Sequence, residues 1–361
     1  MHRTSEFPWE QLEACARRLD DAKSPRKLQP MPGGASTRQF VRVHFHSGKS
    51  AVAMYFPDAT QPEEVTQAAA SVAGRWPFLQ VHDVLSECKV NVPRILAEEC
   101  DHGLILVEDL GDDTLASFLL REPALRDEMY RLAIRDLAAA QARFRNLAGA
   151  TIVQERTFDF ELLHWEVEHF REWALEALGI QLTAGELEVF NRAAVHIARE
   201  AQSWPRVFVH RDYQSRNLMV QRSEAGHRLV WIDFQDALMG PRVYDLVALL
   251  NDSYQSFTAS FISERLSEYL VHAGLPPSGM PQLRHEFDWI TVQRKLKDAG
   301  RFVYIDRVKG NSSFLRFVIP TIAKARLAIG SLSDDAIMAD LATCLDSWSV
   351  RIEAALDRAS E

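Results

Sequence analysis

Runs rich in β-branched and aromatic residues, separated by turns, dominate the first third of the chain and predict β-strands. One pair of runs is joined by Ser47, Gly48 and Lys49 and predicts a hairpin. Two segments with helical spacing and end signals predict helices. The predicted strands are residues 40–45, 51–56, 92–98 and 103–111, and the predicted helices are residues 9–20 and 59–74.

In the rest of the chain the apolar residues recur mostly every three or four positions, which predicts helices. One such apolar stripe, at 160–178, predicts a single long helix. The exception is 206–234, where the short runs RVFVH and RLVWIDF predict the strands of a hairpin. The pattern therefore predicts an α+β fold with a sheet-rich N-lobe at 1–110 and a mainly helical C-lobe at 111–361. The link between the lobes is expected near 108–113.

Composition narrows the class of protein. The 361 residues are 47% hydrophobic and 25% charged, which excludes disordered and fibrous classes. A formal net charge of −9 argues against nucleic acid or an anionic membrane surface as the main partner. The four cysteines lack CxxC spacing, so neither a zinc site nor a disulfide framework is expected. Without a signal sequence or a long apolar stretch, we expect a cytoplasmic protein that contacts no membrane, with its oligomeric state left open.

The segment VFVHRDYQSRNLMV at 207–220 carries the candidate chemistry. Phosphoryl transfer needs a group that aligns the attacking hydroxyl and oxygen ligands for Mg²⁺. Asp212 suits the first role, while Asn217 and Asp233, in the later segment VWIDFQDA, suit the second. Each residue alone would be an ordinary turn, loop or strand-end residue, but the three in this order favour a phosphoryl-transfer site. We interpret His210 as structural, holding the loop through hydrogen bonds.

These motifs carry a family resemblance. HRDYQSRN resembles the catalytic loop of protein-kinase-like enzymes, and IDFQDA resembles their metal-binding DFG segment with Gln235 in place of glycine. GPRVYDLVALL at 240–250 is similar to the segment after the metal aspartate in the aminoglycoside phosphotransferase/choline kinase-like superfamily, where the residue matching Asp245 is structural, at the start of a helix. ASTRQFVRV, AVAMYFP, LILVEDLGDDTL and TVQRKLKDAGRF make the chain most similar to the N-acetylmuramate/N-acetylglucosamine anomeric kinase branch. The resemblance spans about residues 31–320 and implies a bilobal protein-kinase-like fold, with ATP and Mg²⁺ as cofactors.

The predicted nucleotide site differs from that of protein kinases on the third strand. Met54 stands there in place of the lysine that holds the phosphates. We expect Met54 to line the adenine pocket and Arg38 or Arg42 to reach the phosphates, with an exposed strand face as the alternative for the arginines. The shortened glycine loop PGGAST is expected to cradle phosphate oxygens, and LILVEDLG to bind adenine through its main chain. The predicted nucleotide contacts are Gly33, Gly34, Ser36, Thr37, Arg38, Met54, Glu108 and Leu110.

A basic ridge is predicted near the C-terminus. Arg294, Lys297 and Arg301 follow one another at intervals of three and four residues on one helix face. This ridge either recognises an anionic group on the substrate, such as a sugar carboxylate, or is a solvated face on which Arg294 pairs with Asp298.

An acidic helix face at 159–176 has two similar interpretations. It is expected to be a solvent-exposed face, as most charged helix faces are. The alternative is that it borders a site for sugar hydroxyls, together with Trp165 or Trp173.

The sequence as a whole predicts an ATP- and Mg²⁺-dependent kinase of a small molecule. The preferred acceptor is the anomeric hydroxyl of N-acetylmuramate or N-acetylglucosamine, in the recycling of cell-wall sugars. An aminoglycoside or another metabolite alcohol is the alternative acceptor. A catalytically silent nucleotide-binding regulator is the alternative outside the enzyme class, and the methionine on the third strand is what favours it.

Overall fold

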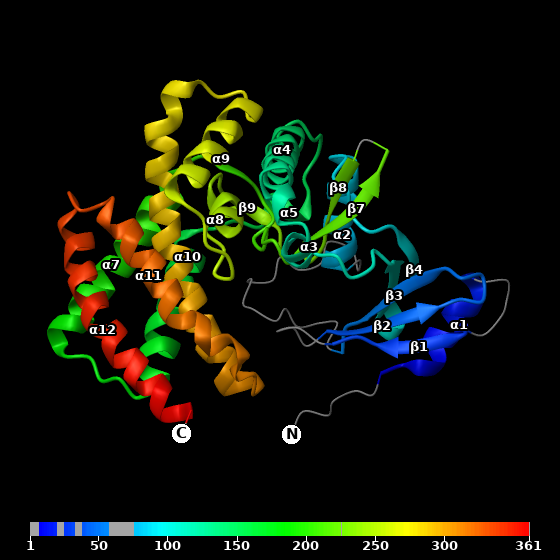
Figure 1. The fold of residues 1–361 in the computed structure, drawn as a ribbon, viewed down its shortest axis with the longest axis horizontal. Helices are drawn as coiled ribbons and strands as arrows, with labels where there is room; N and C mark the ends of the chain where they lie inside the picture. Colours follow the sequence, from blue (N-terminus) through cyan, green and yellow to red (C-terminus); the bar gives the residue numbers. More distant parts are fainter. Residues whose placement is uncertain (1–6, 20–24, 33–37, 58–75, 225, 361) are drawn as a thin grey trace. The chain divides into compact units, whose positions relative to one another are not determined.

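The computed structural model describes the chain except for residues 1–6, 20–24, 33–37, 58–75, 225 and 361. The predicted helix at 59–74 and the phosphate-loop residues Gly33, Gly34, Ser36 and Thr37 therefore lie outside the described residues. The chain divides into two compact units, shown in Figure 1. The first unit is Met1–Arg121 with Arg216–Gln235, and the second is Glu122–Ser215 with Asp236–Glu361. The lobe boundary expected at residue 110 stays a prediction.

The first unit is built on an antiparallel sheet of order β1-β2-β3-β5-β4. Residues on one face of β2, β3 and β5 pack against Leu12 and Cys15 of α1 to form a buried core. The predicted helix at 9–20, the hairpin and the two later strands are thereby confirmed. The elements are α1 (Trp9–Leu19), β1 (Lys27–Pro30), β2 (Gln39–His44), β3 (Ser50–Tyr55), α2 (Pro77–Glu87), β4 (Ile95–Glu99), β5 (Leu104–Glu108) and α3 (Leu115–Arg121).

A second hairpin joins the first unit from much later in the chain. Its strands are β7 (Leu218–Ser223) and β8 (Gly226–Trp231), which pair with each other. Hydrogen bonds from Val220 N–H to the Asp113 carbonyl (2.7 Å) and from Trp231 N–H to the Asn91 carbonyl (2.8 Å) attach it to the unit. The predicted hairpin between RVFVH and RLVWIDF is wrong, because each of these strands finds another partner. Local patterns locate strands, but they do not select among partners that are distant in sequence.

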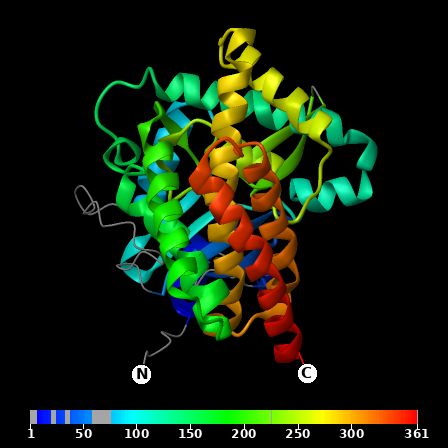
Figure 2. The ribbon, with the colours of Figure 1, turned by 90° about the vertical axis from the view of Figure 1, so that its left-hand side faces the viewer.

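The second unit is mainly helical. Helices α7, α10, α11 and α12 run side by side in Figure 2 and enclose a core that includes Phe190, Trp289 and Trp348. Its only strand pair among the described residues is β6 (Arg206–Val209) with β9 (Leu238–Pro241). The α-helices are α4 (Arg126–Phe144), α5 (Ile152–Glu155), α6 (Phe160–His169), α7 (Ala184–Ser203), α8 (Tyr244–Leu250), α9 (Ala259–His272), α10 (Met280–Lys309), α11 (Val318–Gly330) and α12 (Ala336–Ser360).

The predicted single helix at 160–178 is three successive helical segments. α6 ends at His169, a π-helix spans Phe170–Leu175, and a 3₁₀ turn completes the stretch at Glu176–Leu178. The change to π geometry occurs where α10 crosses with Gly300 at the contact. A Cβ atom built on Gly300 would lie 2.2 Å from the carbonyl oxygen of His169, so the two main chains touch directly. Apolar spacing alone cannot reveal such a crossing.

Candidate active site

The loop that follows β6 is held by a buried carboxylate at the start of α8. Asp245 accepts hydrogen bonds from the main-chain N–H groups of His210 (2.6 Å) and Arg211 (3.0 Å). The N–H group of Asp212 donates in turn to Nδ1 of the buried His210 at 3.2 Å. Burial raises the pKa of Asp245 to about 7, against the opposing effect of the two hydrogen bonds. The structural roles expected of Asp245 and His210 are confirmed, and Asp245 acts on the loop as well as at its own helix start.

Arg211 has a left-handed backbone conformation, with φ 79°, that residues with a side chain rarely adopt. Such a conformation costs on the order of 1–3 kcal/mol and persists only where the surroundings enforce it. The buried guanidinium of Arg211 donates to Glu166 at 2.9 Å and lies 5.7 Å from the ring centroid of Phe158. These contacts hold the main chain immediately before Asp212.

Glu166 is fully buried on α6, so the expectation of a solvent-exposed acidic face is wrong at this position. Its carboxylate accepts hydrogen bonds from Arg211 and from the Tyr244 hydroxyl (3.0 Å), and Lys297 Nζ lies 3.5 Å away. Burial favours the protonated acid, but the charges of Lys297 and Arg211 outweigh it and lower the pKa of Glu166 to about 2. An ionised carboxylate therefore interacts with two buried cations inside the second unit.

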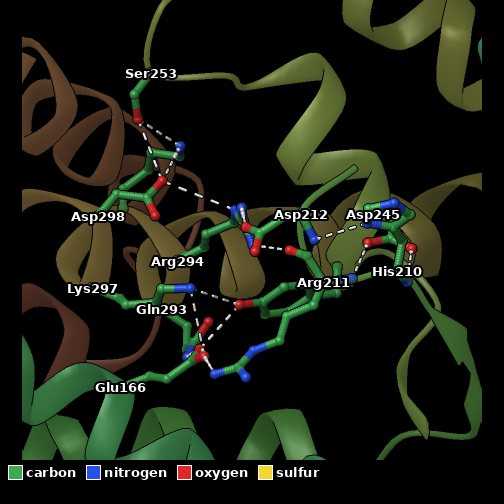
Figure 3. Close-up of polar contacts among 12 residues, drawn as sticks. Glu166, His210, Arg211, Asp212, Asp245, Ser253, Gln293, Arg294, Lys297 and Asp298 are labelled. Carbon is green, nitrogen blue, oxygen red and sulfur yellow. Dashed lines mark hydrogen bonds and ion pairs between the residues drawn. The ribbon is translucent and has the colours of Figure 1, made fainter. Parts of the chain in front are cut away.

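Arg294 reaches the same loop from α10, as Figure 3 shows. Its side chain is 0% exposed, it donates to the main-chain oxygen of Arg211 at 2.7 Å, and its other terminal nitrogen lies 3.3 Å from Oδ1 of Asp212. The expected pair with Asp298 exists, with 3.9 Å between Nε and Oδ2. Because both of these side chains are buried, the interpretation of this ridge as a solvated face is wrong for Arg294.

Asp212 keeps 38% of its side-chain surface exposed, although the cations behind it are buried. Burial opposes ionisation, but the positive charges of Lys297 and Arg294 prevail and hold the pKa of Asp212 below its ordinary value. The carboxylate is therefore ionised at neutral pH and can accept a hydrogen bond from an alcohol. A carboxylate of low pKa aligns a hydroxyl better than it removes a proton, which suits the loose transition state of phosphoryl transfer.

The three cations of the predicted ridge have different surroundings. Arg294 and Lys297 are buried and bound to acidic or main-chain partners in the second unit. Arg301, two helical turns beyond Arg294, is partly exposed and lies over the ring of Tyr304, with Cζ 4.8 Å from the centroid. The ridge is therefore two buried cations beside the catalytic loop and one cation at the surface.

The candidate metal ligands lie in the first unit, at the adjoining ends of β7 and β8. The N–H group of Ile232 donates to the main-chain oxygen of Asn217 at 3.0 Å, which holds Asn217 beside the strand that leads to Asp233. Asp233 has a φ of 63°, and its Oδ1 accepts hydrogen bonds from Arg38 (2.5 Å) and Gln235 (3.3 Å). Arg38 also donates to Oε1 of Gln235 at 2.9 Å, so Arg38, Asp233 and Gln235 form one connected group.

The donor set fits Mg²⁺. A carboxylate and an amide oxygen are hard ligands, and Mg²⁺ in nucleotide sites takes few protein ligands beside phosphate and water oxygens. Across the part of the chain that the structure describes, no group of three or more His, Cys, Asp or Glu side chains is placed to hold a metal ion by itself. Asp233 and Asn217 would therefore share a metal ion with the phosphates rather than enclose it.

The two arginines of the first hairpin contact different partners. Arg42 lies 2.9 Å from Asp109 and 2.7 Å from Asp112, on the segment that follows β5, whereas Arg38 binds Asp233. The side chains of Arg38 and Arg42 are only 12% and 13% exposed, so the alternative of an exposed strand face is wrong for both. Gln235 is the partner that sequence analysis missed, and its replacement of the DFG glycine was the available signal.

The predicted adenine contacts lie on β3 and at the end of β5. Met54 is buried, at 7% exposure, on the face of β3 opposite the α1 core. The N–H group of Glu108 donates to the Arg94 carbonyl at 2.9 Å, and the Leu110 carbonyl accepts from Gln221 at 2.5 Å. Since these two main-chain groups already have partners, adenine recognition by the segment would use its other main-chain groups.

Comparison with known proteins gives the class of this site. Residues 27–285 match the family described as "Phosphotransferase enzyme family", which is more than half of the chain. The chain belongs to this family. It is an enzyme of the phosphotransferase class, and the expected reaction class is confirmed.

Two relatives cover most of the chain. An N-acetylmuramate/N-acetylglucosamine kinase of Pseudomonas aeruginosa is 33% identical over 314 residues, covering 84% of this chain and 86% of the relative. A protein of the same name from Neisseria meningitidis is 30% identical over 273 residues, covering 74% and 75%. The resemblance to this branch that the motifs suggested is confirmed.

Solved structures of lower identity share the fold. A choline kinase from Cryptosporidium parvum aligns over 95% of this chain and 99% of its own, with a TM-score of 0.61 and 12% identity. An ADP-bound aminoglycoside phosphotransferase aligns over 86% and 97%, with a TM-score of 0.55 and 13% identity. The predicted kinase-like α+β fold is confirmed. None of the helices among the described residues is long and apolar enough to cross a membrane.

Proposed function

We propose that this phosphotransferase uses ATP and Mg²⁺ to phosphorylate the anomeric hydroxyl of N-acetylmuramate or N-acetylglucosamine in the cytoplasm. The choice of acceptor is supported by the two relatives, whose names state these sugars and which match about three quarters or more of the chain. The observation that carries the proposed chemistry is the ionised carboxylate of Asp212, partly exposed and backed by the buried Arg294.

Asp212 would align the acceptor hydroxyl by accepting its hydrogen bond. The main chain around Asp212 is fixed by Asp245 and Arg211, so its carboxylate is oriented before the substrate arrives. Such preorganisation lowers the barrier because the reacting atoms need no further alignment. The proton of the hydroxyl would pass to the Asp212 carboxylate late in the transfer.

The lobe at 1–110 would cover the nucleotide phosphates, and the lobe at 111–361 would provide the catalytic loop, the metal site and the acceptor site. ATP supplies the phosphoryl group, and Mg²⁺ neutralises its charge. Asn217 and Asp233 would hold the metal, and Arg38 would take the place of the third-strand lysine beside the phosphates. Met54 and the main chain of 108–110 would contact adenine, and the glycine loop at 33–37 would cover the phosphates.

The test is phosphate transfer to a panel of N-acetylmuramate, N-acetylglucosamine and kanamycin, with parent protein and Asp212→Asn. We expect transfer to both sugars and a loss of turnover of at least about a thousandfold in the variant, because the carboxylate is removed without a change of size. Nucleotide binding should stay within about twofold of the parent.

Asp159→Asn is the matched control for this variant. Asp159 caps α6 by accepting the N–H of Leu162 at 2.9 Å, and asparagine caps helices equally well. The control should keep full turnover. Transfer to kanamycin alone would remove the amino sugars as acceptors, and turnover of Asp212→Asn within about threefold of the parent would remove Asp212 from its role.

A further inference from the structure

Four aromatic side chains and one arginine form a connected cluster on α6, the π-helix and α10. The ring centroids of Trp165 and His169 are 4.5 Å apart, those of His169 and Tyr304 6.2 Å, and those of Trp173 and Tyr304 4.9 Å. Arg301 lies over the Tyr304 ring at 4.8 Å. We call these five residues the acceptor wall.

Most of the acceptor wall differs from the core beside it in exposure. Trp165, Trp173, Arg301 and Tyr304 are partly exposed, whereas the fifth member, His169, is buried at 7% and the nearby Phe170 is 0% exposed. Rings that keep an exposed face, with a cation among them, suit a ligand that combines an apolar face with a negative charge. A pyranose ring with a carboxylate substituent has this combination.

The main chain beneath the acceptor wall is unusual. π-Helices are rare and often occur at functional sites, and this one carries Trp173. Gly300, next to Arg301, lets α10 approach His169 so closely that any Cβ would overlap its carbonyl group. This close crossing is what brings the α6 rings and the α10 residues into one cluster.

Arg301 of the acceptor wall lies on the same ridge of α10 as Arg294, the residue that contacts Asp212. Seven residues separate Arg294 from Arg301, which is a rise of about 10 Å along the helix. A monosaccharide with its hydroxyl at Asp212 and an arginine side chain can together cover this span. Arg294 and Lys297, which precede Arg301 on this helix face, are buried and bound to other groups of the protein.

We propose that the acceptor wall is the sugar-binding site, and that Arg301 binds the carboxylate that N-acetylmuramate has and N-acetylglucosamine lacks. The assignment rests on the proposed function. Trp165 and Trp173 contact the pyranose and acetamido groups common to both sugars. Arg301, held over Tyr304, forms a charge-assisted hydrogen bond that only the acidic sugar accepts.

The test measures binding as well as turnover, with Arg301→Gln and a matched control. Arg307→Gln removes the same charge from the same helix, where Arg307 is 42% exposed and its Nε lies 3.6 Å from Asp306. Calorimetry with nucleotide-free protein gives Kd for each sugar, and phosphate transfer gives kcat/KM. We expect Arg301→Gln to weaken N-acetylmuramate at least tenfold in both quantities and to leave N-acetylglucosamine within twofold, while Arg307→Gln changes neither.

A second variant examines the rings. Trp165→Leu should weaken both sugars by similar factors, because the ring contacts what they share. Equal effects of Arg301→Gln on both sugars, or no effect on either, would overturn the assignment of Arg301 while the parent still transfers phosphate to them. If the parent neither binds nor phosphorylates either sugar, the proposed function and the acceptor wall fail together.

Discussion

Replacing Arg294 by methionine removes the cation behind Asp212, the proposed catalytic carboxylate, while keeping most of the side-chain volume. The guanidinium is 0% exposed and contacts the Arg211 carbonyl, Asp212 and Asp298. Asp298 keeps its 2.7 Å ion pair with Lys295, so the loss falls mainly on Asp212 and on the carbonyl group. We expect a loss of unfolding free energy of about 2–3 kcal/mol, since one buried acceptor loses its donor and one ion pair is broken.

The effect on Asp212 follows from the 3.3 Å distance between the two charged groups. Coulomb attraction at this distance is about 5 kcal/mol at an effective dielectric constant of ~20 and about 1.3 kcal/mol in bulk water. Because Asp212 is 38% exposed, screening by water is substantial, and we expect about 1.3–2.7 kcal/mol. Loss of this attraction should raise the pKa of Asp212 toward its ordinary value.

The assay is the pH dependence of kcat/KM in the parent and in Arg294→Met. The active form of Asp212 is the carboxylate, whose pKa in the parent is depressed, so activity is lost only as pH falls through that low pKa. In the variant the acid limb should move to higher pH, because a cation that lowers the pKa of Asp212 is gone. The plateau of kcat should fall by at least about tenfold, because the orientation of the carboxylate is lost.

Arg284→Met is the matched control, since Arg284 forms an i,i+4 pair with Asp288 on the same helix at 3.0 Å. It should leave the acid limb unchanged. If Arg294→Met lowers stability but keeps the acid limb of the parent, Arg294 is only structural and the proposed support of Asp212 is refuted. If Arg294→Met is too unstable to assay, Arg294→Lys is measured in its place. Lysine keeps the positive charge, so the acid limb of kcat/KM should lie close to that of the parent.

Three further predictions concern the metal, the pH dependence of stability and the helix crossing. Asp233→Ala should abolish the Mg²⁺ dependence of ATP affinity in calorimetry, because it removes the charged ligand, while Asp112→Ala should leave the magnesium titration unchanged. Neighbouring cations outweigh burial and lower the pKa of Glu166 to about 2 from 4.5, so its stabilisation, about 3 kcal/mol, is complete above pH 4.5 and lost as pH falls toward 2. In urea unfolding at several pH values, the unfolding free energy of Glu166→Gln should not show this dependence on pH. An equal pH dependence in both proteins would contradict the ion pairs of Glu166 as its source. Gly300→Ala should destabilise by about 3 kcal/mol or more because its Cβ meets main chain, whereas Gly185→Ala, in open space on α7, should be neutral or slightly stabilising in thermal melts.

Local sequence patterns were sufficient for features whose cause is local. The hairpin of β2 and β3 follows from alternating residues around a tight turn, and α1 from its apolar spacing. The order and spacing of Asp212, Asn217 and Asp233 indicated phosphoryl transfer because that chemistry constrains a short segment. The comparisons confirm the reaction class.

Only the tertiary structure decided how the charges of α10 are used. Spacing placed Arg294, Lys297 and Arg301 on one ridge, but a ridge is exposed or buried according to what packs against it. Arg294 pairs with Asp212, which lies 82 positions away in the sequence. Lys297 pairs with Glu166, which lies 131 positions away. Predictions from amphipathic periodicity assume that the buried residues of a helix are apolar. They fail where a buried charged side chain pairs with an oppositely charged residue that is distant in the sequence. The candidate catalytic residues could therefore be proposed from the sequence, whereas the buried ion pairs around Asp212 depend on contacts that only folding creates.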